Sequence, residues 1–253
     1  MEAYGDDLDA VLERALKQGV TGVITIGIDE PSSRRAIELA RRYPMVRATI
    51  GVHPHDAASL NNQMLSRLKD LALAHRDVIV GYGEIGLDYV KLYSEPKLQR
   101  RWFRAQLELA SELELPVIIH DREAHEDTLR LLREGGPLKQ GGIMHCFSGN
   151  LDLAQQVMDL GLLISIPGVV TFKKAPETQE VAAQIPLDSL LVETDGPFLA
   201  PMPWRGKRNE PCYALYTAGK IAELRGISID EVARHTTRNC QRVLNFPPAN
   251  NAS

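Results

Sequence analysis

Short apolar runs rich in β-branched residues alternate with amphipathic segments along almost the whole chain. The runs expected to form strands cover residues 21–28, 46–52, 78–84, 117–120, 143–145, 162–166 and 190–193. The segments expected to form helices cover residues 7–18, 32–43, 61–74, 94–113, 124–133, 151–160, 176–185, 214–225 and 228–244. Because strands that alternate with helices are joined by crossover connections, this order predicts a parallel sheet covered by helices.

The expected strands are one fewer than a closed eight-stranded barrel needs. The chain opens with an expected helix, residues 7–18, and a strand ought to precede that helix. We therefore predict an α/β fold of the TIM-type (β/α) barrel class, with seven strands present and the first one missing. Single barrels commonly occupy about this length, so one domain covering residues 1–253 is expected.

Composition and charge limit the classes of function. An apolar content of 44% and a charged content of 25% are ordinary for a globular protein. No apolar stretch approaches the roughly 20 residues that cross a bilayer, and the acidic opening lacks signal-peptide features, so we expect a cytoplasmic monomer without membrane contact. The net charge of −4 disfavours binding of nucleic acid by the whole surface, so a phosphate-bearing substrate would need a local positive site.

Four side chains that can bind a divalent metal follow apolar runs in separate parts of the chain. They are Glu84, His120, His145 and Asp195. The carboxyl ends of barrel strands open on one face, so these residues are expected to converge. One histidine at a strand end is more often structural, but two histidines with carboxylates favour a metal. The pattern predicts one or two divalent ions per chain, with Mg, Mn or Zn as candidates.

Asp195 is also the candidate catalytic residue, because a carboxylate beside a metal can accept a proton from water. Helix capping is the alternative role for Asp195. The candidate substrate-binding residues are His53 and His55, which follow another strand, and Arg208, Asn209 and Glu210 in a charged loop. Arginine recognises phosphate through paired hydrogen bonds, although a solvated charged run is an equally simple interpretation of this loop.

Six segments resemble the TatD family of metal-dependent deoxyribonucleases, within the amidohydrolase-like barrels. They are Gly51-Val-His-Pro-His55, Gly83-Glu-Ile-Gly-Leu-Asp-Tyr89, Leu115-Pro-Val-Ile-Ile-His120, His145-Cys-Phe-Ser-Gly149, Glu193-Thr-Asp-Gly-Pro-Phe-Leu-Ala-Pro201 and Arg208-Asn-Glu-Pro211. They run in the family's order across nearly the whole chain. The resemblance implies a barrel with metal at its mouth, Glu84, His120, His145 and Asp195 as ligands, and a nucleic acid substrate, DNA above all.

The resemblance also implies a feature that this sequence lacks. In the family, one metal is held by the equivalents of Glu84, His120 and His145. A second metal uses the glutamate, the aspartate and a His-x-His pair on the first strand, whereas here Met1-Glu-Ala-Tyr-Gly begins where the family's first helix begins. Removal of a strand would expose two ladder edges. We therefore expect a shortened form of a longer protein, which the intact mass of the native product would test.

The expected activity is metal-dependent hydrolysis of a phosphodiester. A water activated by the metal would attack phosphorus, Asp195 would take up its proton, and Arg208 would offset the developing negative charge. Two alternatives stay open. The first is hydrolysis of an amide, lactone or aminoacyl ester, because a fold and a metal site do not define the substrate. The second is a catalytically weak protein that binds metal or nucleic acid, because the second metal site is incomplete.

Overall fold

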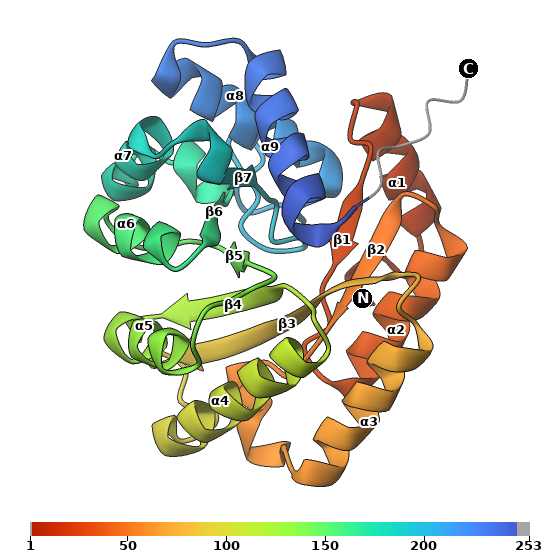
Figure 1. Ribbon diagram of the computed structural model, residues 1–253. Helices are drawn as coiled ribbons and strands as arrows, with labels where there is room; N and C mark the ends of the chain where they lie inside the picture. Colours follow the sequence, from red (N-terminus) through yellow and green to blue (C-terminus); the bar gives the residue numbers. More distant parts are fainter. Residues whose placement is uncertain (1, 247–253) are drawn as a thin grey trace.

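The computed structural model describes residues 2–246 and contains a curved sheet of parallel strands with helices around its outside (Figure 1). The strands are β1 (Val23–Thr25), β2 (Val46–Ile50), β3 (Ile79–Asp88), β4 (Val117–Arg122), β5 (Gly142–Met144), β6 (Leu162–Ile166) and β7 (Leu190–Val192). They lie in sequential order, and each pairs in parallel with the next. The predicted α/β barrel-type fold with seven strands is confirmed.

The helices alternate with the strands as the sequence predicts. They are α1 (Leu8–Lys17), α2 (Glu30–Arg42), α3 (Asn62–Ala74), α4 (Pro96–Glu112), α5 (His125–Glu134), α6 (Leu151–Asp159), α7 (Pro176–Gln184), α8 (Ala214–Arg225) and α9 (Ile229–Leu244). Short 3-10 turns are η1 (Glu2–Tyr4), η2 (Pro54–Ser59), η3 (Gly168–Thr171), η4 (Leu187–Ser189) and η5 (Pro211–Tyr213). Among residues 2–246, no helix is long and apolar enough to cross a bilayer.

Two helix starts show how capping sets the boundaries. The prediction that α2 begins at Ser32 is wrong, because Asp29 is the cap: its carboxylate accepts a 2.7 Å hydrogen bond from the Ser32 amide, and the Ser32 hydroxyl accepts one from the Asp29 amide. This reciprocal box starts the helix earlier. The start of α9 is also capped, since the Ser228 hydroxyl accepts a 3.1 Å hydrogen bond from the Glu231 amide.

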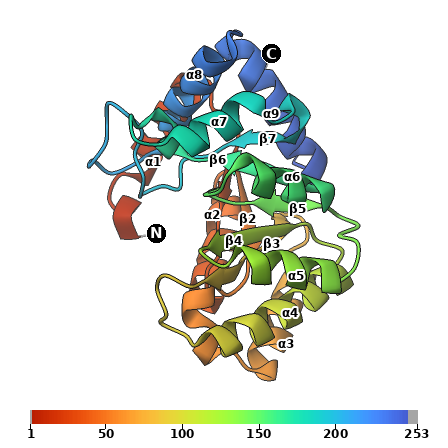
Figure 2. The ribbon, with the colours of Figure 1, turned by 90° about the vertical axis from the view of Figure 1, so that its left-hand side faces the viewer.

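The two faces of the sheet are covered by different elements. The larger apolar cluster packs the outer face of the strands against the surrounding helices. The smaller cluster joins one side chain from each of five strands to the end of α9; its members are Val80, Ile118, Ile143, Leu163, Leu191 and Leu244. Figure 2 shows α9 beside β7. Leu244 at the end of α9 packs against these inner side chains.

The end of α9 also bridges the two edges of the sheet. Within residues 2–246, β1 and β7 do not pair with one another, so the sheet is open. Just after α9, the Phe246 ring lies so close to Gly22, ahead of β1, that a Cβ there would meet a ring carbon at 2.7 Å. The Arg47 guanidinium of β2 lies over the same ring, 5.2 Å from its centroid. These contacts tie the last helix to the first strands.

Truncation of Leu244 tests the role of α9. Its side chain is 2% exposed, so Leu244→Ala is expected to lower the free energy of unfolding by about 2–5 kcal/mol through lost burial and a residual cavity. Leu73→Ala on α3, where the leucine is 48% exposed, is the matched control and should change it by less than about 0.5 kcal/mol. Urea unfolding measures both. Equal effects in the two variants would show that α9 does not support the inner face.

Candidate metal centre

The pairing of β3 with β4 assembles the first part of the site. The prediction that Glu84 and His120 end their strands is wrong, because β3 continues to Asp88 and β4 to Arg122. Alternate residues of a strand share a face, so Glu84 and Asp88 point the same way with Gly86 between them. Gly86 is the register partner of His120. The imidazole of His120 therefore lies between two carboxylates.

Gly86 makes this close pairing possible. A Cβ at this position would lie 1.9 Å from the carbonyl oxygen of His120, and the backbone φ of +146° is one that side chains with a Cβ rarely adopt. Only glycine satisfies both conditions. The glycine-rich stretch of β3 is thus required by the approach of the neighbouring strand.

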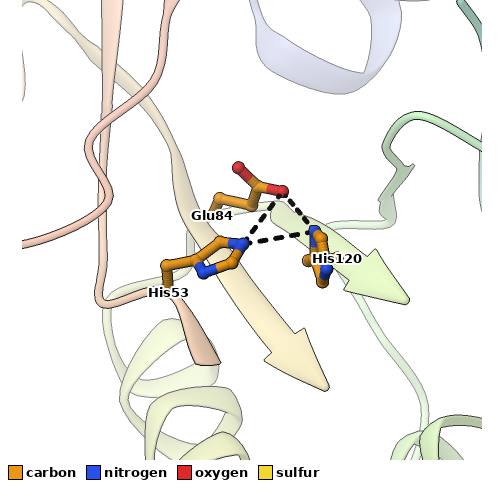
Figure 3. A group of neighbouring side chains, drawn as sticks. All are labelled: His53, Glu84 and His120. Carbon is orange, nitrogen blue, oxygen red and sulfur yellow. Dashed lines mark hydrogen bonds and ion pairs between the residues drawn. The ribbon is translucent and has the colours of Figure 1, made fainter. Parts of the chain in front are cut away.

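Three side chains point their donor atoms at one place (Figure 3). His120 Nδ1 lies 2.8 Å from Glu84 Oε1 and 3.3 Å from His53 Nε2, and the His53–Glu84 distance is 3.8 Å. Donors about 2.1 Å from a tetrahedral ion are roughly 3.4 Å apart, so the spacing fits a shared cation. Two imidazoles and a carboxylate suit zinc or manganese. The set fits a divalent metal, and it includes His53, which the sequence analysis placed with the substrate.

Asp88 connects this group to His55. Its Oδ2 lies 2.9 Å from His55 Nε2 and 3.2 Å from His120 Nε2, while Oδ1 accepts hydrogen bonds from the backbone amides of residues 90 and 91. The carboxylate is almost completely buried. Asp88 therefore orients both imidazoles, in the way that outer carboxylates orient metal-binding histidines.

A second group forms at the ends of β5 and β7. His145 Nδ1 lies 2.7 Å from Glu193 Oε2, and His145 Nε2 lies 3.5 Å from Asp195 Oδ1. Glu193 Oε2 also accepts a hydrogen bond from the Cys146 amide, whereas its buried Oε1 has no partner among the described residues. His145 and Asp195 thus lie side by side. Within the described part of the chain they are not among the three residues whose donor atoms converge.

Burial and nearby charges give His53, Glu84 and His120 different protonation states. Burial lowers the pKa of His53 to about 3, so this ring is neutral and offers a lone pair. Burial opposes the charge on His120, but hydrogen bonds to Asp88 and Glu84 raise its pKa to about 9. Burial also opposes ionisation of Glu84, but His145 and His120 lower its pKa to about 2. A metal here would replace a proton on His120.

The pKa values of His145 and Asp195 in the second group are also shifted by burial and by neighbouring charges. Burial disfavours the charged form of His145, yet the carboxylates of Glu193 and Glu84 raise its pKa well above the usual value. Burial raises the pKa of Asp195, and the hydrogen bond to His145 acts in the opposite direction. A carboxylate with a raised pKa is a better proton acceptor than an exposed one.

The three candidate residues in the charged loop make contacts within the protein. Arg208 pairs with Asp7 at 2.6 Å and with Glu210 at 3.0 Å. Glu210 also receives hydrogen bonds from Arg14 of α1. The buried amide of Asn209 donates to the carbonyl oxygens of residues 194 and 198. These contacts join the loop to α1 and stabilise its path, and the predicted role in substrate binding stays a prediction.

Glu193, which is not among the candidate site residues that the sequence predicts, pairs with His145 in the structure. The available signal was its position in the Glu193-Thr-Asp195 segment, one residue after β7. Asp88 is likewise not among the candidate site residues that the sequence predicts. Its true importance depends on the length of β3, which the apolar pattern alone did not show.

The model of one protein family, described as TatD related DNase, matches residues 1–245. The chain belongs to the TatD family. It is 45% identical over 242 residues to the metal-dependent hydrolase YabD of Bacillus subtilis, covering 96% of this chain and 94% of YabD. It is 38% identical over 243 residues to the 3'-5' ssDNA/RNA exonuclease TatD of Salmonella typhimurium, covering 94% and 93% of the two chains.

Solved structures of TatD proteins have the same fold. The TatD homologue YJJV of Escherichia coli matches with a TM-score of 0.90 at 32% identity, covering 95% of this chain and 93% of that one. A TatD family hydrolase from Entamoeba histolytica matches with a TM-score of 0.86 at 26% identity, covering 96% and 90%. The predicted family membership and metal-dependent hydrolase class are confirmed, and these relatives lend no support to the two alternative functions.

The stability of the metal-free TatD chain should depend on pH through His120. Its pKa is about 9 in the folded state against 6.5 ordinarily, so its contribution is fully present below pH 6.5 and is lost as the pH rises through 9. The free energy of unfolding in a chelator, measured by urea titration, should fall over this range. His120→Gln should flatten the decline. His75→Gln, at the C-terminal cap of α3, is the control and should leave the decline unchanged.

Proposed function

We propose that this chain hydrolyses phosphodiester bonds of nucleic acid, with DNA as the expected substrate. The convergence of His53, Glu84 and His120 on one point carries the proposal, because such a set suits a catalytic divalent metal. The name of the Salmonella relative, a 3'-5' ssDNA/RNA exonuclease, supports a nucleic acid substrate. The single-domain organisation, the monomeric state and the substrate-binding roles of His55, Arg208, Asn209 and Glu210 stay predictions.

The proposed metal ligands are Glu84, His120, His145 and Asp195, with His53 added from the geometry. A bound divalent ion would supply Lewis acidity that polarises a phosphoryl oxygen and acidifies water. Neutral His53 and ionised Glu84 already have the protonation states that ligands need. Magnesium, manganese and zinc all remain candidates, since imidazole favours the last two and carboxylate suits the first.

Asp195 is proposed to accept the proton of the attacking water. Its pKa is raised by burial, and His145 lies 3.5 Å away to hold its carboxylate in place. Glu193 holds the other nitrogen of His145 at 2.7 Å. Glu193 therefore fixes the orientation of the His145 ring, and the His145 ring in turn positions the carboxylate of Asp195. Outer carboxylates orient functional histidines in the same way.

Replacement of Asp195 by asparagine tests this role. Asp195→Asn should lower turnover of single-stranded DNA by about 10²- to 10⁴-fold, because the amide cannot accept the proton. Asp70→Asn, on the exposed surface of α3, is the matched control and should keep full activity. Nuclease rates under saturating manganese and thermal melting measure activity and folding separately. Unchanged turnover in Asp195→Asn would refute the assignment.

Replacement of Glu84 by glutamine tests the metal site itself. The neutral amide is a weaker ligand, so metal affinity should fall by more than about 10-fold. That factor is the smallest loss usual for removing a residue that only hydrogen-bonds to a metal ligand. Glu108→Gln, exposed on α4, is the control and should bind metal like the original chain. Isothermal titration with manganese and elemental analysis report the affinity and stoichiometry. Equal affinities in all three proteins would exclude Glu84 as a ligand.

A further inference from the structure

The loop between β7 and α8 exposes large aromatic side chains. Trp204 is 37% exposed and Phe198 is 68% exposed, and Tyr216 on the first turn of α8 is 40% exposed. Isolated exposed apolar residues are common, but a group of aromatic rings is a sign of binding. Figure 2 shows this loop projecting next to α1, to which Arg14 and Glu210 tie it.

The rings of this loop form an ordered stack. The Trp204 and Tyr213 rings are parallel, with an angle of 2° between their planes and 5.2 Å between their centroids. Tyr216 meets both rings edge-on, at 6.4 Å from Trp204 and 5.9 Å from Tyr213. Arg205 adds a guanidinium 4.6 Å from the centroid of the Phe172 ring. The stack therefore presents flat π faces beside a cation.

Hydrogen bonds within the loop hold this arrangement in place. The Trp204 amide donates to the carbonyl of residue 201 at 2.7 Å, and the Lys207 amide donates to the Trp204 carbonyl at 2.9 Å. The Met202 amide donates to the Thr171 hydroxyl at 2.8 Å, which joins the loop to η3. Because the backbone is fixed by these bonds, little ordering entropy remains to be lost when a ligand binds.

Unpaired cations lie around the rings. Lys173, Lys174, Arg205 and Lys207 are exposed, and none forms an ion pair in the portion of the chain that the structure describes. Arg208 in the same loop is different, since Asp7 and Glu210 neutralise it. A chain with a net charge of −4 therefore has a locally positive surface here. Such a surface attracts a polyanion.

The rings and cations occupy the end of the sheet that carries the candidate metal centre. The loop follows β7 from Glu193 onward and includes Asp195, three residues before Phe198, and η3 follows the carboxyl end of β6. The carboxyl ends of all parallel strands open on one side. A strand bound on this loop can therefore extend toward the His145 and Asp195 side chains.

We propose that Phe172, Trp204, Arg205, Lys207, Tyr213 and Tyr216, called here the aromatic–basic surface, bind unpaired nucleotides of a single-stranded polynucleotide. This inference rests on the proposed function. It assigns the binding of the nucleic acid substrate to the aromatic–basic surface. Bases stack on the aromatic rings while phosphates meet Arg205 and Lys207. In a duplex the bases are stacked inside and cannot reach the rings. The surface thus selects single strands over duplexes.

Binding of a phosphorothioate oligothymidylate, which resists hydrolysis, tests the proposal with the manganese-loaded protein. By fluorescence anisotropy, Trp204→Ala should weaken binding roughly 5- to 150-fold, the effect of one lost base–aromatic contact. Trp204→Phe should restore most of the affinity, which separates stacking from a folding defect. Leu73→Ala on α3 is the control for an exposed apolar side chain and should bind normally.

The cations are tested by the salt dependence of the same binding. Arg205→Gln should reduce the slope of log affinity against log salt by about 0.7, the value for one phosphate contact of a single strand. Trp204→Ala should leave the slope unchanged. Arg101→Gln is the matched control, because Arg101 also lies 4.6 Å over a ring, that of Trp102, but on α4. Equal slopes for Arg205→Gln and the original chain would overturn the role of Arg205.

Two further measurements separate the inference from the proposed function. Bis(p-nitrophenyl) phosphate has a phosphodiester but no nucleobase, so its hydrolysis by the original chain tests the proposed function without an oligonucleotide. If the original chain cleaves no phosphodiester yet Trp204→Ala loses oligonucleotide binding, the proposed function fails and the surface stands. If duplex and single strand bind equally, or if Trp204→Ala only converts a dimer to a monomer in sedimentation, the aromatic–basic surface is not a nucleotide site.

Discussion

The parallel pairing of β3 with β4 is the contact on which the candidate site depends. Gly86 faces His120 across the ladder, and this register sets the imidazole between Glu84 and Asp88. A shift by one residue would turn both carboxylates to the other face of the sheet. The site is therefore a consequence of strand register, and the register in turn requires glycine at position 86.

Burial of charge explains the rest of the site's arrangement. An isolated charge in the interior is costly, so each buried carboxylate must have a partner. His120 is placed between Glu84 and Asp88, and His145 between Glu193 and Asp195. Protons occupy these imidazoles without a metal, and a divalent cation would satisfy the same carboxylates with more charge. The electrostatics that support the fold are thus also those that favour a metal.

Residues that stabilise the open sheet and residues that form the candidate site lie in different parts of it. Leu244 at the end of α9 packs on the inner face, and Phe246 just after the helix contacts the segment ahead of β1. Polar side chains collect at the carboxyl ends, where the loops after β6 and β7 add aromatic rings and cations. Stability and chemistry can therefore vary separately, which is the usual property of barrel-type folds.

Periodicity in the sequence determined the order of strands and helices, the parallel sheet and the positions of Glu84, His120, His145 and Asp195 as metal-ligand candidates, because these depend on local chemistry. Only the tertiary structure decided that β3 runs on to Asp88, that His53 joins the donors, and that Glu193 holds His145. It also decided that Arg208 meets Asp7, 201 residues away in the chain. Register and long-range pairing depend on contacts between distant segments, and no local pattern encodes those contacts.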